Sequence, residues 1–149
     1  MKKIIYILVF SFAFFGCGKR EKVDYANCTK DELTISPYLI QYFNAFVDDC
    51  ELQGLKYDHA YCLNWIRMGH LRGIQGETNF HDGTIEINEH LLKDTIGMKF
   101  VVYHEIGHWY GLDHSDGIMK ENYNSDDTEW VRENWDELLE DYFTKLKNQ

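Results

Sequence analysis

Residues 104–119 read HEIGHWYGLDHSDGIM and contain three of the seven histidines in this 149-residue chain. His104 and His108 are four residues apart, so on an α-helix their imidazoles project from one face and can bind the same metal ion. Gly111 can adopt the left-handed conformation that ends a helix and turns the chain, which would bring His114 back to that ion. Three protein ligands with a fourth position open to water are typical of a catalytic zinc site.

Glu105 has the position of a general base. It is rotated by about 100° from His104 around the helix, so it can flank the metal without binding it. A carboxylate in that place can take the proton of a zinc-bound water and later deliver it to a leaving amine. The spacing therefore predicts one catalytic Zn²⁺ and a zinc-bound water activated by Glu105.

The residues before the motif predict a helix that begins near Asp94 or Thr95 and runs through the protein core. The stretch TIGMKFVVYHEIGHWY is apolar on every side except for Lys99 and the site residues, and such a helix is buried all round. Glycine costs a helix about 1 kcal/mol relative to alanine. Gly97 and Gly107 therefore indicate close packing against neighbouring elements.

The remaining pattern predicts one α+β domain over residues 36–149. The dipeptide Ser36-Pro37 predicts a helix over about residues 37–52, because a hydroxyl cap followed by proline starts helices. A last helix is expected from the end of SDD, residues 125–127, to about Lys147, since its apolar residues recur at helical spacing.

Two stretches between these helices predict strands. Residues 60–67, AYCLNWIR, are rich in residues that favour strands, and residues 70–75 are a candidate partner for them. Residues 83–88, GTIEIN, alternate between apolar and polar side chains, as a strand with one buried face does.

The N-terminal residues predict export. Two lysines follow Met1, and residues 4–15 form an apolar run of about a dozen residues, which is too short to span a bilayer and suits a secretory signal. The run ends in FFGC, which resembles the lipobox of bacterial lipoproteins. The resemblance implies a signal peptide over residues 1–16 and lipidation of Cys17. It also implies a tether and entry segment over residues 17–35, and a location on a bacterial membrane, at the outer membrane or cell surface. An ordinary signal peptide or a weak membrane anchor is the alternative.

The charge of the mature chain argues against anionic partners. Without residues 1–16, 13 Lys and Arg remain against 25 Asp and Glu, a net charge of −12. Such a domain is poorly suited to nucleic acid or to an anionic membrane surface, so membrane contact is expected from the lipid alone. A monomer is expected.

The mature chain has three further cysteines, Cys28, Cys50 and Cys62. In an exported protein one pair can oxidise, and Cys50–Cys62 would close a short loop. Because the number is odd, at least one thiol stays free. No pair has the C-x-x-C spacing of a zinc or redox site, so buried thiols or one disulfide are expected.

The opening motif resembles that of a known family. HEIGHWYGLDH matches HExxHxxGxxH, the long zinc motif of the metzincin metallopeptidases. GIM at residues 117–119 is similar to their Met-turn, in which Met119 would form a hydrophobic floor beneath the three imidazoles without binding the metal. Ser115, directly after the third histidine, is the residue found there in matrixins.

The resemblance implies a small, mixed, twisted sheet with a buried zinc-binding helix and a C-terminal helix. It implies an endopeptidase whose peptide or protein substrate lies in a cleft beside an edge strand, either residues 70–75 or residues 84–88. The Pro and Tyr that often follow the Met are missing, and Tyr123 lies four residues beyond Met119. A transition-state role for Tyr123 is therefore not expected. The other histidines have no partner spacing and are read as ordinary.

Three alternatives stay open from the residues alone. The first is a zinc-binding lipoprotein that acts as a binding or interaction module without turnover. The second is a zinc hydrolase that acts on small amides or esters but not on peptides. The third is a structural domain that holds no metal tightly.

Overall fold

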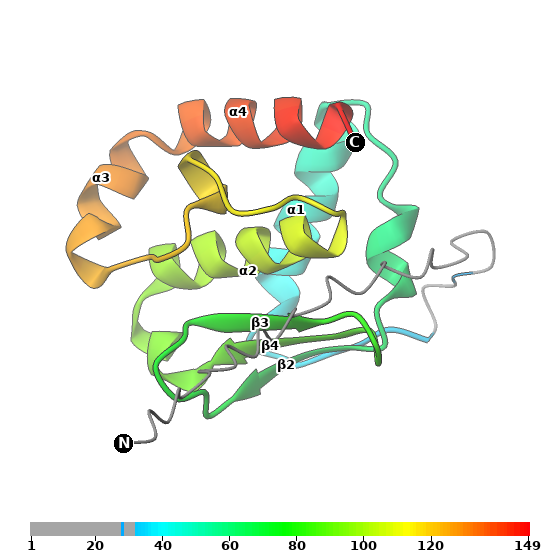
Figure 1. Cartoon of the computed structure of the whole chain (residues 1–149), viewed down its shortest axis with the longest axis horizontal. Coiled ribbons are helices and arrows are strands. Elements are labelled where there is room, and N and C mark those ends of the chain that lie inside the picture. Colours follow the sequence, from blue (N-terminus) through cyan, green and yellow to red (C-terminus); the bar gives the residue numbers. More distant parts are fainter. Residues whose placement is uncertain (1–27, 29–31) are drawn as a thin grey trace, which may run out of the picture.

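The computed structural model describes Cys28 and residues 32–149 (Figure 1). Helices pack against one four-stranded sheet whose strand order is β1-β2-β4-β3. The first three strands in this order run parallel and β3 runs antiparallel to β4. The predicted α+β class with a small mixed sheet is therefore confirmed. The strands are β1 (Thr34–Ile35), β2 (Trp65–Gly69), β3 (Gly76–Asn79) and β4 (Thr84–Asn88).

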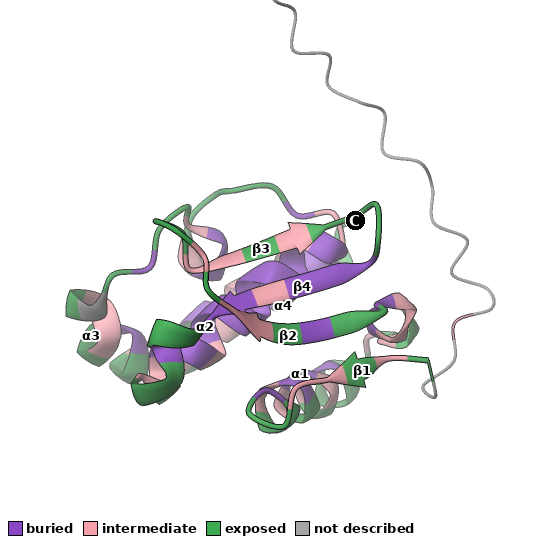
Figure 2. Ribbon diagram, turned by 90° about the horizontal axis from the view of Figure 1, so that it is seen from below, coloured by how far each residue is buried: buried purple, intermediate pink, exposed green. Residues whose placement is uncertain are grey.

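The predicted strand over residues 83–88 is β4, and it lies in the interior of the sheet. Ile85 and Ile87 are completely buried beneath the helices, while Glu86 on the other face pairs with Arg67 of β2 at 2.8 Å. The alternation of apolar and polar residues thus sets which face of the sheet packs on the core. Figure 2 shows α1 and α2 on one side of the strands.

Helix α2 (Thr95–Trp109) confirms the prediction of a buried helix that begins near Asp94. The Asp94 side chain accepts a hydrogen bond from the backbone N–H of Gly97 at 2.8 Å, which caps the first turn. Nearly every residue from Gly97 to Trp109 is buried. The helix contacts β3 and β4 on one side and α1 (Ile40–Leu52) on another.

Two predicted elements differ from the structure. Helix α1 begins at Ile40, because the residues after Ser36 first form a turn in which Leu39 N–H donates to the Ser36 carbonyl at 2.8 Å. The predicted last helix is two helices, α3 (Thr128–Glu133) and α4 (Trp135–Lys147). They are separated at Asn134, whose φ of −108° and ψ of 15° leave the helical region.

The strand predictions for residues 60–67 and 70–75 are partly wrong. Residues Asp58–Cys62 form a 3-10 helix, η2, and β2 begins only at Trp65. Residues 70–75 form a loop, and the strand after them, β3, pairs with β4 rather than with β2. Ala60 in this helical turn and Leu63 directly after it are buried, so both contribute to the core without being part of a strand.

A disulfide joins Cys28 to Cys62, with Cα atoms 4.8 Å apart, and Cys50 is a buried free thiol. The pairing Cys50–Cys62 is therefore wrong. Cys50 lies on the core face of α1, whereas Cys28 and Cys62 precede β1 and β2, which pair in parallel. Tertiary register, which sequence spacing does not show, selects the pair.

Helix α4 covers α2 on the side away from the sheet. Tyr142 is fully buried, and its hydroxyl donates a hydrogen bond to the Tyr103 carbonyl of α2 at 2.7 Å. Phe143 stacks on Phe46 of α1 with ring centroids 6.2 Å apart. Among the described helices, none combines the length and the apolar character that crossing a membrane requires. The predicted signal peptide and Cys17 lie outside the described residues.

Candidate active site

The structure brings three of the histidines together. His104 and His108 project from one face of α2, and His114 comes from the loop after it. The Nε2 atom of His108 lies 3.0 Å from the Nε2 atom of His104 and 3.0 Å from that of His114. His104 is only 7 % exposed, whereas His114 faces solvent. Within the described residues this is the one group of His, Cys, Asp and Glu side chains arranged to hold a metal ion.

The imidazole tautomers show that this cluster suits a cation. His104 Nδ1 lies 2.8 Å from the carbonyl oxygen of Ile118, and His108 Nδ1 lies 2.8 Å from that of Leu112. A carbonyl only accepts hydrogen bonds, so both Nδ1 atoms carry hydrogen, and in a neutral imidazole the Nε2 atom is then the one that can bind a metal ion.

A zinc ion fits this arrangement. Tetrahedral zinc with Zn–N bonds of about 2.0–2.1 Å places its nitrogen ligands roughly 3.3 Å apart, close to the observed separations. Histidines that bind metal usually donate their other ring N–H to a carboxylate or a backbone carbonyl, as His104 and His108 do here. The donor set and the orientation of the rings therefore both suit Zn²⁺.

The turn at Gly111 returns the chain to the cluster. Gly111 has a φ of 98°, a backbone conformation that residues with a Cβ rarely adopt. The backbone N–H of Gly111 donates to the His108 carbonyl at 2.8 Å, and that of Leu112 donates to the Gly107 carbonyl at 2.9 Å. These bonds satisfy carbonyls at the end of α2. They also direct the following residues, including His114, back over the helix.

The turn at Gly117–Met119, a 3-10 helix labelled η4, lies beneath the histidines. Met119 is 1 % exposed, and its backbone carbonyl accepts from Ser115 N–H at 2.9 Å, which closes the loop that directly follows His114. A Cβ on Gly107 would lie 2.5 Å from the Met119 sulfur. The glycine in α2 therefore allows Met119 to pack directly against the helix backbone.

Glu105 is buried beside the histidines, with 4 % of its surface exposed. Burial raises the pKa of its carboxyl to about 7, and the hydrogen bond from Thr78 opposes that rise. Burial also lowers the pKa of His104 to about 4, which keeps that imidazole neutral and able to bind metal near pH 7. Thr78 Oγ1 lies 2.7 Å from Glu105 Oε2 and 2.9 Å from the Glu105 backbone carbonyl.

A cleft of about 430 Å³ gives access to Glu105 and the histidines. One wall consists of β3 and the loop before it, the floor is α2, and the other wall is the segment after the Met-turn, residues 120–124. β3 is at the edge of the sheet. Neither residues 70–75 nor β4 is the edge strand, so both of the strands predicted for that role are wrong.

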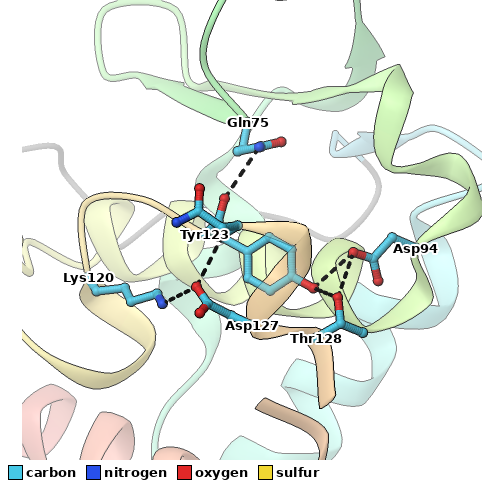
Figure 3. A network of polar contacts seen from close by, with 7 residues as sticks. Gln75, Asp94, Lys120, Tyr123, Asp127 and Thr128 are labelled. Carbon is cyan, nitrogen blue, oxygen red and sulfur yellow. Dashed lines mark hydrogen bonds and ion pairs between the residues drawn. The ribbon is translucent and has the colours of Figure 1, made fainter. Parts of the chain in front are cut away.

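A polar network holds the far wall of the cleft (Figure 3). The Tyr123 hydroxyl donates to Asp94 Oδ2 at 2.8 Å and lies 2.6 Å from the hydroxyl of Thr128. Burial and the neighbouring Asp94 raise the pKa of Tyr123 to about 12, although the Thr128 hydroxyl opposes this rise. Gln75 Nε2 donates to the Tyr123 carbonyl at 3.4 Å, across the cleft. The Tyr123 hydroxyl is thus hydrogen-bonded to Asp94, at the N-terminal end of α2.

The other histidines lie away from the cluster. His70 pairs with Glu89 at 2.9 Å on the surface, and His59 packs against Tyr110 with ring centroids 5.4 Å apart. His81 and His90 are exposed.

Two residues that contact Glu105, Gly76 and Thr78, were not found from the sequence. They lie two apart on β3, so both face α2, and a Cβ on Gly76 would lie 2.6 Å from Glu105 Oε1. The dipeptide Asp82-Gly83 before an alternating strand is a signal for a hairpin. It would have placed an antiparallel strand directly before the turn, where β3 lies.

Comparisons with known proteins give one match. Residues 38–139 match the family model Peptidase_M10, described as Matrixin. This range covers more than half of the chain and includes the histidine cluster, Glu105 and the Met-turn. No curated protein and no solved structure matches the chain.

Proposed function

Because the chain belongs to the matrixin family of zinc metallopeptidases, we propose that it is an exported, lipid-anchored zinc endopeptidase. The observation that carries the proposal is the convergence of three imidazole nitrogens beside one buried carboxylate. Both lie in a cleft along the edge of a sheet.

We assign the residues of the cluster as follows. His104, His108 and His114 hold one Zn²⁺, with Met119 as their hydrophobic floor and Gly111 as the turn that completes the set. When bound, the zinc ion would polarise the scissile carbonyl and lower the pKa of a water molecule in the cleft.

Glu105 is the general base of the proposed reaction. A proton moves from the attacking water to the Glu105 carboxylate as the oxygen bonds to the scissile carbonyl carbon. The same proton then moves from Glu105 to the amine nitrogen as the C–N bond breaks. The buried position of Glu105, with its pKa raised to about 7, suits a group that must both take and release a proton near neutral pH.

The substrate is proposed to bind as an additional strand. β3 pairs with β4 on one side, and its other edge faces the cleft. An extended peptide placed there would form backbone hydrogen bonds with β3. Its scissile bond would then lie above α2. This mode of binding requires an extended backbone, so peptides and unfolded segments of proteins are the expected substrates.

Location on a membrane is proposed from the lipobox-like FFGC at Cys17. If lipidation anchors the protein, Cys17→Ser should shift it from the membrane fraction of the producing bacterium to the soluble fraction. A Cys50→Ser control, which changes a buried thiol in the domain, should stay with the membrane. Attachment that is equal in Cys17→Ser and the unaltered chain would contradict lipidation at this residue.

The activity is tested with the full-length chain in mild detergent, loaded with one equivalent of zinc. A mixed peptide library is incubated with this protein and with Glu105→Gln at equal metal content, and products are identified by mass spectrometry. We expect cuts by the unaltered chain and a loss of about 10²-fold or more in the variant. Zinc binding without cuts in either protein would contradict the endopeptidase and favour a binding module.

A further inference from the structure

We propose that Thr78 is a positioning residue for the reaction, which fixes the orientation of the Glu105 carboxylate by a hydrogen bond from the sheet. This inference deepens the proposed function and rests on it. It starts from the contact between β3 and α2, which joins the edge strand to the helix that carries Glu105.

The Thr78 hydroxyl touches two atoms of Glu105. Its oxygen lies 2.7 Å from Glu105 Oε2 and 2.9 Å from the Glu105 backbone carbonyl oxygen. When Glu105 is ionised, both atoms are pure acceptors and only the hydroxyl can donate. The hydrogen bond to the carboxylate is then the stronger one, because its acceptor carries charge.

The other carboxylate oxygen, Oε1, lies against β3 at Gly76. A Cβ on Gly76 would be 2.6 Å from Oε1, 2.8 Å from Glu105 Cγ and 2.8 Å from a methyl group of Val101. The strand can approach α2 this closely only because residue 76 has no side chain. Gly76 thus provides the space and Thr78 provides the hydrogen bond, from the same face of the strand.

The consequence is a fixed orientation for a group that could otherwise rotate. A glutamate has three side-chain torsions, and its terminal torsion is broad. Holding Oε2 at Thr78 restricts these torsions, so the carboxylate that takes the proton of the water and passes it to the leaving amine keeps one orientation. Proton transfer requires the donor and acceptor atoms to lie within hydrogen-bond distance, so a carboxylate fixed in advance should react faster.

The same arrangement links substrate binding to the base. Thr78 and Gly76 belong to the strand on which the peptide is proposed to add. Backbone hydrogen bonds from the peptide to β3 would therefore hold the strand against α2, and with it the orientation of Glu105.

The test compares Thr78→Val, which removes the hydroxyl at nearly equal volume, with Thr78→Ser, which keeps it. Thr84→Val, in the neighbouring strand β4, is the matched control. For each full-length protein, kcat and KM are measured on a peptide that the unaltered chain cleaves, together with zinc affinity and Tm. The Glu105 carboxyl ¹³C resonance, identified by its loss in Glu105→Gln, is recorded in the metal-free proteins.

We expect kcat of Thr78→Val to fall by about 10- to 100-fold, the range for losing a hydrogen bond to a charged group. KM, zinc affinity and Tm should change little. Thr78→Ser should stay within about threefold of the unaltered chain. In a Glu105→Gln background, Thr78→Val should cause no further loss, because the group it positions is absent. The Glu105 resonance should shift in Thr78→Val and return in Thr78→Ser.

Three results would overturn the inference while the proposed function stands. They are an active Thr78→Val, a loss equally large in the Glu105→Gln background, and a loss explained by weaker zinc binding or a lower Tm. If the unaltered chain cleaves no peptide, the proposed function fails and the inference fails with it.

Discussion

The two halves of helix α2 are joined to the following chain in different ways. At its N-terminal end, Asp94 accepts hydrogen bonds from Gly97 N–H and from the Tyr123 hydroxyl. In its C-terminal half, the contacts are the imidazoles of His104 and His108. Their Nδ1 atoms donate to backbone carbonyls, and their Nε2 atoms point at one another.

The two halves differ in the kind of atoms that meet there. Around Asp94 every donor named above has an acceptor, so this contact needs nothing from outside the chain. Around His108 the Nε2 atoms of His104 and His114 both lie 3.0 Å from its own Nε2, and imidazole nitrogens are preferred ligands of zinc. The N-terminal half should therefore contribute to stability in all conditions, and the C-terminal half should depend on metal.

The largest effect is expected from His108→Ala. His108 Nε2 is 3.0 Å from both other ligand atoms, so its loss removes the central ligand. Zinc affinity should fall by more than about 10²-fold. Removing only a hydrogen-bond partner of a metal ligand already lowers affinity by about 10- to 100-fold, and losing the ligand itself should cost more. Competition with a chelating indicator measures this, and His90→Ala, an exposed histidine, is the control. Equal affinities in the two variants would refute the assignment of the cluster.

A matched pair of glycine substitutions separates the two halves. A Cβ added at Gly107 would lie 2.5 Å from Met119 Sδ. A Cβ added at Gly97 would lie 2.5 Å from both Asp94 Oδ2 and Tyr123 Cε1. Each change to alanine should lower the free energy of unfolding by about 1–3 kcal/mol through overpacking. Only Gly107→Ala should also weaken zinc binding, because it displaces the turn that carries Met119.

Urea unfolding of the metal-free proteins, combined with zinc titration, checks this pair. A similar loss of zinc affinity in Gly97→Ala would show that the two halves of α2 are not independent.

The pH dependence of the metal-free protein sharpens the comparison further. The pKa of Glu105 is raised from 4.5 to about 7 by burial, so the folded state binds its proton more tightly than the unfolded state does. The resulting stability is present below pH 4.5 and is lost as the pH rises through 7. Glu105→Gln removes the cost of ionising a buried carboxyl, and at pH 8 it should be more stable than the unaltered chain by about 3 kcal/mol.

At pH 5 the difference should be small, which thermal unfolding at both values can measure. The pKa of His104, lowered to about 4, acts in the opposite direction: stability is lost as the pH falls from 6.5 towards 4. Because this histidine is present in both proteins, its contribution cancels in the comparison. A constant difference from pH 5 to 8 would argue against a buried, titrating Glu105.

The smallest effect is expected from Tyr123→Phe. The change removes one hydrogen bond to Asp94, which still accepts from Gly97 N–H, and should cost about 1 kcal/mol. Since the pKa of Tyr123 is raised to about 12, the hydroxyl stays protonated and the cost should be equal at pH 6 and pH 9. Denaturant unfolding measures it. A cost that appears only with zinc bound would place Tyr123 in the metal-dependent half instead.

Much of the site could be predicted because its residues are close in sequence. The interval between His104 and His108 fixes one helix face, and a glycine at residue 111 is a local signal for the turn. The buried helix could likewise be predicted from local composition. Each of these predictions needs only the geometry of a helix and its end.

The elements that were missed depend on distant parts of the chain. The residues GETN of β3 contain no apolar side chain, so burial gives no periodic signal there, and Thr78 meets Glu105 only through tertiary packing. The break at Asn134 was hidden because Val131 and Trp135 continue the helical spacing across it. The Cys28–Cys62 pair follows from the register of β1 on β2.

The position of β3 at the sheet edge has a consequence for the protein's solubility. An exposed edge strand can pair with a second chain and start an aggregate. β3 has only four residues, and its outward side carries Glu77 and Asn79, which disfavour continued pairing. Across the cleft, residues 120–124 form the opposite wall. A second copy of the protein would have to enter this cleft to pair with β3, so the wall limits the growth of an aggregate from this edge of the sheet.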